Sequence, residues 1–284
     1  MTTLEALAIA TPRLAAAGIP SSSRDAELFL LHVTGWDRAK LLARPETSLT
    51  VAQEALFLAL VEERARRRPL QHLTGTQAFW RHDFRVTPDV LIPRPETEIL
   101  VEAAIDRLRG HEHATVVDVG TGSCCIALSL ASELPRATVH GTDVSEAALA
   151  VASDNADRLK LSGRVIWHRG DLLAPFALAG EIDMIVSNPP YVDPSDAPSL
   201  APEVRDHEPG LALFPPGDAY SIYRRLIPDA ARLLVPRGWL ILEIGQGMSP
   251  GVVALCRDAG LEVETVIPDL QSIPRVVVAR RTAA

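Results

Sequence analysis

From residue 115 onward, short β-branched segments alternate with segments of helical period, and this alternation restricts the possible folds more than any other feature of the sequence. A strand, a crossover helix and a further strand pair in parallel, so repeated units build a mostly parallel sheet with helices on both faces. The pattern predicts strands at residues 115–119, 138–142, 165–168, 184–187, 239–244, 262–267 and 275–279, and helices at 123–132, 146–159, 219–234 and 250–259.

The last two predicted strands have only a short connection between them. Because that connection is too short for a crossover helix, we expect the final strand to insert antiparallel. The sequence therefore predicts an α/β fold with a seven-stranded, mostly parallel sheet whose last strand is antiparallel.

Two further regions precede this sheet. Apolar side chains recur at three- and four-residue spacing from Thr3 to about Arg68. This pattern predicts a small helical bundle as a domain at residues 1–75, with Ser21 to Ser23 as a helix N-cap and Gly35 as a helix stop. Residues 76–92 lose the helical period and predict a hairpin that links the bundle to an α/β domain at 93–284.

A run of basic residues closes the helical region. We interpret it as a solvated helix end that complements the helix dipole, and a partner-binding surface is the alternative. The run consists of Arg64, Arg66, Arg67 and Arg68.

Composition narrows the functional classes. The 284 residues carry a net charge of −8, which gives no general attraction to nucleic acid. Three cysteines predict no disulfide framework, and the nearest histidines, His111 and His113, lack ligand partners, so we expect no metal. Glu5 interrupts any apolar leader and no segment reaches the length of a membrane span, so we expect a cytoplasmic protein without membrane contact.

A glycine-rich turn follows the first predicted strand, where open α/β sheets bind ligands. Gly120, Thr121, Gly122, Ser123 and Cys124 form this turn. Glycine lets the backbone approach a ligand, although packing between strand and helix also selects it. A dinucleotide fingerprint would have glycine where this chain has Cys125, which argues against a nicotinamide cofactor.

Acidic residues stand at the ends of three successive predicted strands. Asp118 suits the ammonium of an amino-acid moiety, and Asp143 suits both hydroxyls of a ribose. Asp171 is placed to meet the exocyclic amine of adenine, with Leu172 covering the ring. Each acid alone could be a helix cap, but together they predict a nucleoside cofactor such as S-adenosylmethionine.

The fourth predicted strand of the sheet ends in Asn188, Pro189, Pro190 and Tyr191. Two prolines fix the backbone and remove two donors, so the turn is rigid and presents acceptors. The Asn188 side-chain oxygen and the Pro189 carbonyl can each accept one hydrogen of a planar –NH2 group, and Tyr191 can offer a flat face. Such acceptors raise electron density on a poorly nucleophilic amide nitrogen. A proline-rich strand exit without function is the alternative reading.

With these residues identified, the chain resembles the protein-(glutamine-N5) methyltransferases that modify class 1 peptide chain release factors. The segment Pro93 to Glu98 is the most specific part of the resemblance, and Asn188 to Tyr191 is shared with adenine-N6 methyltransferases. The other matching segments are Arg24 to Glu27, Pro69 to Gln71 with Gly75, the glycine turn, Glu203 to Pro209 and Glu243 to Gly245.

The resemblance implies a Rossmann-like class I methyltransferase fold, S-adenosylmethionine as methyl donor and the glutamine of a Gly-Gly-Gln loop as substrate. It also implies that residues 1–75 dock the release factor, that Asn188 to Tyr191 clamp the glutamine, and that Asn188 lies beside the cofactor. We expect a monomer. Two departures are Cys124, where the family has glycine, and the altered stretch Pro215 to Ala219.

Three rival functions stay open at this point. The first is methylation of a glutamine in a ribosomal protein, and the second is N6-adenine methylation of nucleic acid, which the acidic balance disfavours. The third is a catalytically inactive binding protein, which the retention of Asp118, Asp143 and Asn188 disfavours.

Overall fold

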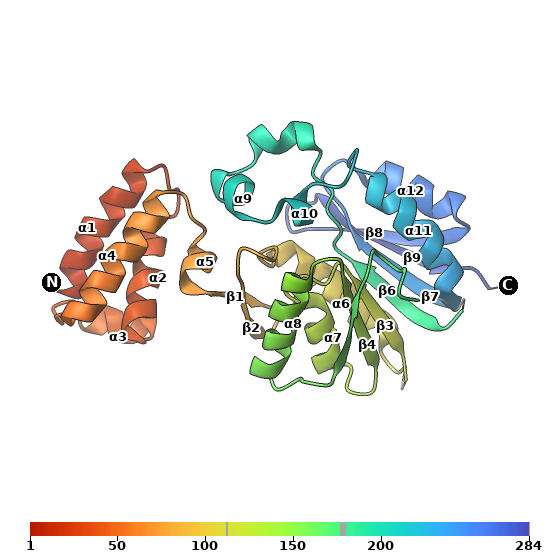
Figure 1. Cartoon of the computed structure of the whole chain (residues 1–284), viewed down its shortest axis with the longest axis horizontal. Helices are drawn as coiled ribbons and strands as arrows, with labels where there is room; N and C mark the ends of the chain where they lie inside the picture. The colour runs from red at the N-terminus through yellow and green to blue at the C-terminus, as the bar shows by residue number, and fades with distance from the viewer. Residues whose placement is uncertain (112, 177–179, 284) are drawn as a thin grey trace. The chain divides into compact units, whose positions relative to one another are not determined.

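The computed structural model describes residues 1–111, 113–176 and 180–283. The chain divides into two compact units (Figure 1). Unit 1 comprises Met1–Thr76 and Ala201–His207, and unit 2 comprises Gln77–Leu200 and Glu208–Ala284. The hairpin predicted as a linker thus lies in unit 2 except for Thr76, and a short segment far along the chain joins unit 1.

Unit 1 is a helical bundle with its own apolar core, in which Phe29, Phe57 and Leu14 are fully buried. Two helices begin with capping boxes, formed by Thr2 with Glu5 and by Thr50 with Gln53. The helices are α1 (Thr3–Ala16), α2 (Ser22–Thr34), α3 (Arg38–Ala43), α4 (Val51–Ala65), α5 (Leu70–Thr74) and α9 (Pro202–His207).

The predicted end signals of α2 differ in outcome. Gly35 ends the helix in the left-handed conformation, with φ of 66°, and its N–H donates to the Leu31 carbonyl, as the sequence predicted. Ser21 occupies the N-cap position but makes no capping bond, because its hydroxyl donates to Asp25 Oδ1 at 2.8 Å.

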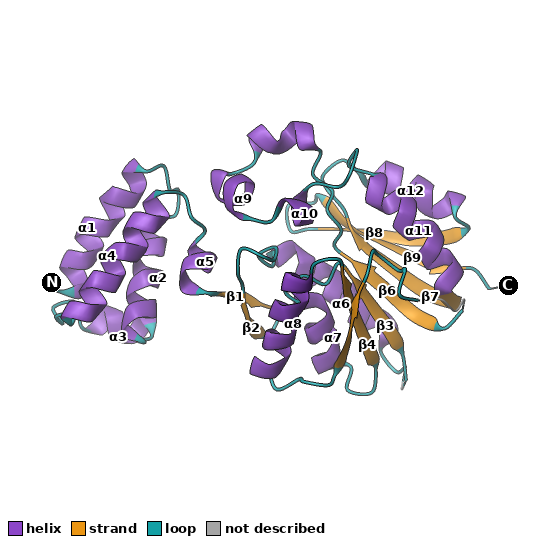
Figure 2. Ribbon diagram, viewed as in Figure 1, coloured by secondary structure: helices purple, strands orange, loops and turns teal. Residues whose placement is uncertain are grey.

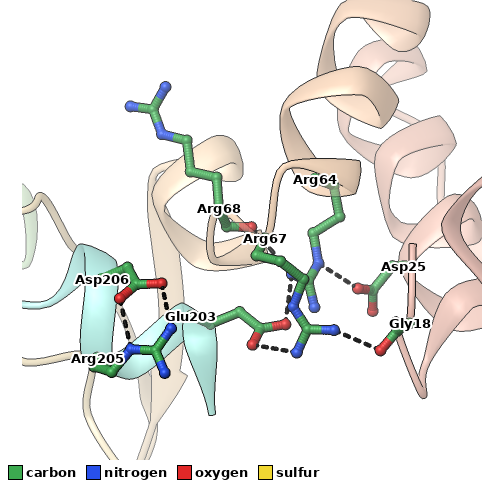
Figure 3. Close-up of polar contacts among 8 residues, drawn as sticks. All are labelled: Gly18, Asp25, Arg64, Arg67, Arg68, Glu203, Arg205 and Asp206. Atoms are coloured by element: carbon green, nitrogen blue, oxygen red, sulfur yellow. Dashed lines mark hydrogen bonds and ion pairs between the residues drawn. The ribbon is translucent and has the colours of Figure 1, made fainter. Parts of the chain in front are cut away.

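The interpretation of the arginine run as a solvated helix end is wrong for two of its members. Arg64 is only 6% exposed, and its guanidinium pairs with Asp25 at 2.8 Å and with Glu203 of α9 at 2.9 Å. Figure 3 shows both carboxylates pointing at this guanidinium, with Arg67 on the second oxygen of Glu203 at 2.6 Å. Arg66 remains exposed. The sequence could not separate these residues, because their partners lie far away along the chain.

Unit 2 begins with the predicted hairpin, formed by β1 (Thr76–Phe79) and β2 (His82–Arg85). Phe79 and Phe84 are buried and meet edge to face, with ring centroids 6.1 Å apart. A short 3-10 helix, η1 (Pro95–Thr97), then leads into α6 (Glu98–Leu108). Helix α6 was not predicted from the sequence, although Leu100 and Leu108 anchor it in the core.

The main sheet has seven strands in the order β5-β4-β3-β6-β7-β9-β8, shown in orange in Figure 2. All of its neighbours pair in parallel except β9, which inserts antiparallel between β7 and β8, as the sequence predicted. The strands are β3 (Thr115–Val119), β4 (Thr138–Asp143), β5 (Val165–Arg169), β6 (Ile182–Ser187), β7 (Leu234–Glu243), β8 (Leu261–Pro268) and β9 (Pro274–Arg281).

Helices cover both faces of this sheet, because alternate strand side chains point to opposite faces. One core contains Val116 of β3 with residues of α6, α7 (Cys125–Glu133) and α8 (Glu146–Arg158). The other contains Val117 with residues of α11 (Ser221–Leu233) and α12 (Ser249–Asp258). The remaining short helices of unit 2 are η2 (Pro194–Ser199) and α10 (Gly210–Leu213). The predicted strand and helix types are confirmed.

Candidate active site

A cavity of about 420 Å³ opens in unit 2 beside the carboxyl ends of β3, β4 and β6. Strand order reverses between β4 and β6 on either side of β3, and open α/β sheets bind ligands at such a point. The volume of the cavity falls within the range typical of small-molecule sites. The predicted site residues that line it are Gly120, Thr121, Gly122, Ser123, Asp143, Asp171, Leu172, Asn188 and Pro190.

The glycine turn is held by backbone and side-chain contacts. The N–H groups of Gly120 and Thr121 both donate to the Thr142 carbonyl at 2.9 Å, and Gly122 N–H donates to Asp143 Oδ2 at 3.0 Å. Gly120 and Gly122 have φ of 72° and 52°, so their left-handed conformation explains why glycine is needed there.

Cys124 follows this turn with φ of 67°, a conformation in which a side chain is strained. It is fully buried and does not line the cavity, whereas its neighbour Cys125 does. Burial raises the pKa of both thiols, and the charge of Asp118 adds to the shift. Neither thiol is therefore activated as a nucleophile.

Asp118 lies beneath the turn rather than in the cavity wall, and it is fully buried. Its Oδ2 accepts from the Thr121 hydroxyl at 2.6 Å and from Ala127 N–H at 3.2 Å. Its Oδ1 has no hydrogen-bond partner within the described residues. Desolvation raises the pKa of Asp118 to about 7, against the lowering effect of those two bonds. A buried acceptor without a partner fits a cationic group bound above the turn.

Asp143 ends β4 at the cavity, and each of its oxygens accepts one backbone N–H, from Gly122 and from Ser145. An ionised carboxylate offers about four acceptor positions, so positions remain for ribose hydroxyls. Asp171 also lines the cavity but is paired with Arg225, a contact that the sequence did not reveal. Leu172 beside it adopts a left-handed φ of 51°.

The turn after β6 divides its side chains between the cavity and the protein interior. Asn188 and Pro190 line the cavity, while Pro189 is buried. Tyr191 is half-buried outside the lining residues, and its hydroxyl donates to Glu243 Oε1 at 3.2 Å. Burial raises the pKa of this phenol, so it stays protonated.

Two buried residues beside this turn were missed as site residues. Asn188 Nδ2 donates to Thr97 Oγ1 at 3.2 Å, and that hydroxyl donates to Glu243 Oε2 at 2.6 Å. Burial raises the pKa of Glu243 to about 7, with the Thr97 and Tyr191 bonds opposing the shift. A carboxylate at the end of an otherwise apolar strand was the available signal.

Glu208 was also missed as a site residue, and its carboxylate joins two distant segments. It accepts from Ile92 N–H at 3.1 Å and from Arg94 at 2.6 Å, and its side chain is almost completely buried. Arg94 in turn lines the cavity. The other lining residues that the sequence analysis did not predict include Val90, Leu91, Pro93, Thr97, Pro209, Leu211, Ala212, Phe214 and Pro216.

Within the described part of the chain, no three His, Cys, Asp or Glu side chains gather in a way that could hold a metal ion. The three cysteines are free and buried, and burial raises the pKa of Cys256 to about 12. No helix among residues 1–111, 113–176 and 180–283 has the length and apolar character needed to cross a membrane.

Comparison with known proteins agrees with this arrangement. Residues 5–75 match the family described as PrmC N-terminal domain, and residues 95–203 match the methyltransferase small domain. A release factor glutamine methyltransferase of Moorella thermoacetica is 46% identical over 99% of this chain and 99% of that protein. The protein of the same description from Cereibacter sphaeroides is 44% identical over the whole of both chains.

Solved structures support the fold alone. The methyltransferase domain of a METTL16 protein aligns with a TM-score of 0.52 and 19% identity, covering 71% of this chain and 89% of that one. The ribosomal protein L11 methylase of Lactobacillus delbrueckii subsp. bulgaricus aligns with a TM-score of 0.51 and 20% identity, covering 70% and 85%. The predicted Rossmann-like class I methyltransferase fold is thereby confirmed.

Proposed function

The chain belongs to the release factor glutamine methyltransferase family, and we propose that it methylates the glutamine in the Gly-Gly-Gln motif of class 1 peptide chain release factors. The acceptor atom is the side-chain amide nitrogen, N5. The observation that carries the proposal is the position of Asn188, which lines the cavity beside the glycine turn with its amide nitrogen already bound to Thr97.

S-adenosylmethionine supplies an electrophilic methyl group on a sulfonium centre. We propose that Gly120, Thr121, Gly122 and Ser123 surround its amino-acid end, with the unpaired Oδ1 of Asp118 facing the ammonium from below. Asp143 then accepts from the ribose hydroxyls. The role assigned to Cys124 is packing beneath the turn, because the residue is fully buried.

The adenine end of the cofactor is assigned to Asp171 and Leu172, which line the cavity at the far side of β4. Asp171 is half-exposed and paired with Arg225, so its carboxylate would accept from both that arginine and the adenine amine. Leu172, held in place by the bond from Thr142 Oγ1 to its carbonyl at 3.1 Å, covers one face of the ring.

An amide nitrogen attacks poorly because its lone pair is delocalised into the carbonyl group. In the proposed mechanism, Asn188 Oδ1 and the Pro189 carbonyl each accept one N–H of the glutamine amide. These acceptors increase electron density at the nitrogen and hold it in line for transfer. Pro190 keeps the turn rigid, and Tyr191 supports the planar amide.

We further propose that unit 1 docks the release factor. The bundle has a core separate from that of unit 2, and it exposes apolar side chains of α1 and α4, among them Leu4, Ile9 and Val51. Removal of residues 1–70 should leave cofactor binding intact and weaken turnover on the intact release factor. Equal turnover on that substrate before and after the deletion would refute the docking role.

A cytoplasmic location and a monomeric state complete the proposal. Three free buried thiols suit a reducing compartment. The net charge of −8 gives no electrostatic reason for direct contact with nucleic acid.

The experiment that tests the proposed function is a competition among acceptors. The purified protein is incubated with radiolabelled S-adenosylmethionine and equal amounts of unmethylated release factor, a ribosomal protein fraction and a duplex oligonucleotide. Label on the release factor alone is the expected result. Label on a ribosomal protein or on adenine would replace the proposal with one of the two rival substrates.

A further inference from the structure

Two buried side chains, Thr97 and Glu243, form with the part-buried Asn188 a directed chain of hydrogen bonds that ends at Asn188. Asn188 Nδ2 donates to Thr97 Oγ1 at 3.2 Å, and Thr97 Oγ1 donates to Glu243 Oε2 at 2.6 Å. Thr97 and Glu243 are only 2% and 1% exposed. They come from η1 and from the end of β7, so the fold brings together groups that lie 146 positions apart.

The chain of bonds has one direction while Glu243 is ionised. A hydroxyl carries a single hydrogen, and Thr97 gives that hydrogen to the carboxylate. Its oxygen can then only accept from Asn188, so the amide must turn its –NH2 side toward Thr97. This leaves Asn188 Oδ1, an acceptor, for the cavity. A flipped amide would set Oδ1 against the lone pairs of the Thr97 oxygen.

We propose that Thr97 and Glu243 are positioning residues that hold the Asn188 amide in the one orientation able to accept a hydrogen from the substrate amide. The inference rests on the proposed function, in which Asn188 Oδ1 receives that hydrogen. Tyr191 stabilises the arrangement through its bond to the second oxygen of Glu243.

The protonation state of Glu243 then controls the direction of the whole chain. A protonated carboxyl group donates to Thr97, whose hydrogen turns toward Asn188, and the amide flips to present –NH2 to the cavity. Asn188 would then present an N–H donor to the substrate amide, which needs an acceptor for its own N–H. Burial raises the pKa of Glu243 to about 7, so this switch falls in an accessible range. The titratable and charged groups that face it are Glu96, Cys125, Tyr191, Tyr223 and Arg275.

The first test compares two substitutions at Thr97. Thr97→Val keeps the shape and removes the hydroxyl, whereas Thr97→Ser keeps the hydroxyl. We expect Thr97→Val to lower kcat by about 10- to 100-fold, a smaller decrease in rate than removal of a whole transition-state contact causes. The KM for S-adenosylmethionine should change by less than about threefold. Thr97→Ser should recover most of the lost kcat. Equal kcat values in the two variants would overturn the inference.

The second test needs no turnover. In the free protein, the ¹³C resonance of the Glu243 carboxyl group and the ¹⁵N side-chain resonance of Asn188 are followed from roughly pH 5.5 to roughly pH 8.5, a range that lies above the unperturbed carboxyl pKa and brackets the raised one. Both should move with a shared midpoint near 7, and Glu243→Gln should abolish the Asn188 transition. The buried amide of Asn155, bound to the Arg85 and Ser123 carbonyls, is the internal control.

An Asn188 resonance that stays fixed while Glu243 titrates would refute the coupling. A wild-type protein that shows the coupled titration but transfers no methyl group to the release factor would refute the proposed function instead. The two failures are therefore distinguishable.

Discussion

Replacement of Arg64 by Met is the perturbation of unit 1 for which the structure gives the clearest magnitude. Met retains most of the apolar stem of the arginine, so the packing around it changes little. What disappears is the guanidinium, with its ion pairs to Asp25 and Glu203 and its bond to the Arg68 carbonyl at 3.2 Å.

The expected loss of stability follows from what is left behind. Removing one partner of a buried ion pair costs about 3–5 kcal/mol. Glu203 keeps its pair with Arg67, and Asp25 keeps the hydrogen bond from Ser21, so the value should lie near the lower limit, at about 3 kcal/mol. A second substitution, Asp25→Asn, removes the stranded charge and should recover part of this loss.

Arg66→Met is the matched control, because Arg66 belongs to the same run but its side chain is 73% exposed and forms an exposed pair with Glu63. This change should cost less than about 0.5 kcal/mol. Urea unfolding of the full chain gives both values, and hydrogen exchange at the amides of α2 and α4 locates the effect in unit 1. Equal losses for the two variants would show that the buried ion pairs of Arg64 do not stabilise unit 1.

Two further predictions concern unit 2. Asp118→Asn should flatten the pH dependence of stability, because burial raises the folded-state pKa of Asp118 to about 7. Wild-type stability is therefore greatest below the unfolded-state pKa and falls as pH rises through about 7, by on the order of 4 kcal/mol in urea unfolding. A parallel pH slope in the variant would contradict this. Gly245→Ala places a Cβ 2.9 Å from Met248 Sδ and 3.0 Å from the Tyr191 ring. The clash should lower the free energy of unfolding by about 1–3 kcal/mol and, because it displaces Tyr191, should also lower kcat. An unchanged melting temperature would count against this packing.

The fold was largely predictable because its signals are local. A β-branched run followed by a helical period marks each strand and crossover helix, and the bounds of β3 at Thr115–Val119 agree to the residue. The errors also have local causes. Pro236 and Gly238 interrupt the apolar pattern at the start of β7, so only its second half was predicted. Asp183 similarly interrupts the apolar run at the start of β6, so only its later part was predicted.

The site was predictable where a residue ends a strand, and it was not predictable where the contact is tertiary. Asp143 and Asn188 follow β4 and β6 directly, and both line the cavity. Thr97, Glu208 and Glu243 act through partners more than 90 positions away, and no spacing rule reveals such pairs. Their presence in segments that carried the family resemblance was one available signal, and for Glu243 its position at the end of an otherwise apolar strand was another.

The outcome for Arg64 has the same explanation. Its burial depends on Glu203, which lies in a segment that leaves the α/β unit to join the helical one. A helical period read over residues 1–75 contains no information about that segment. Charge runs at helix ends are therefore separable into solvated and buried members only once the tertiary partners are known.

The proposed activity is transfer of a methyl group to one glutamine side chain of a release factor. The most direct measurement is peptide mapping by mass spectrometry after incubation of wild-type protein, and separately Asn188→Ala, with S-adenosylmethionine and unmethylated release factor. We expect a single added methylene mass on the glutamine of the Gly-Gly-Gln motif with wild-type protein, and almost none with the variant. A methyl group on another residue, or equal methylation by the variant, would contradict it.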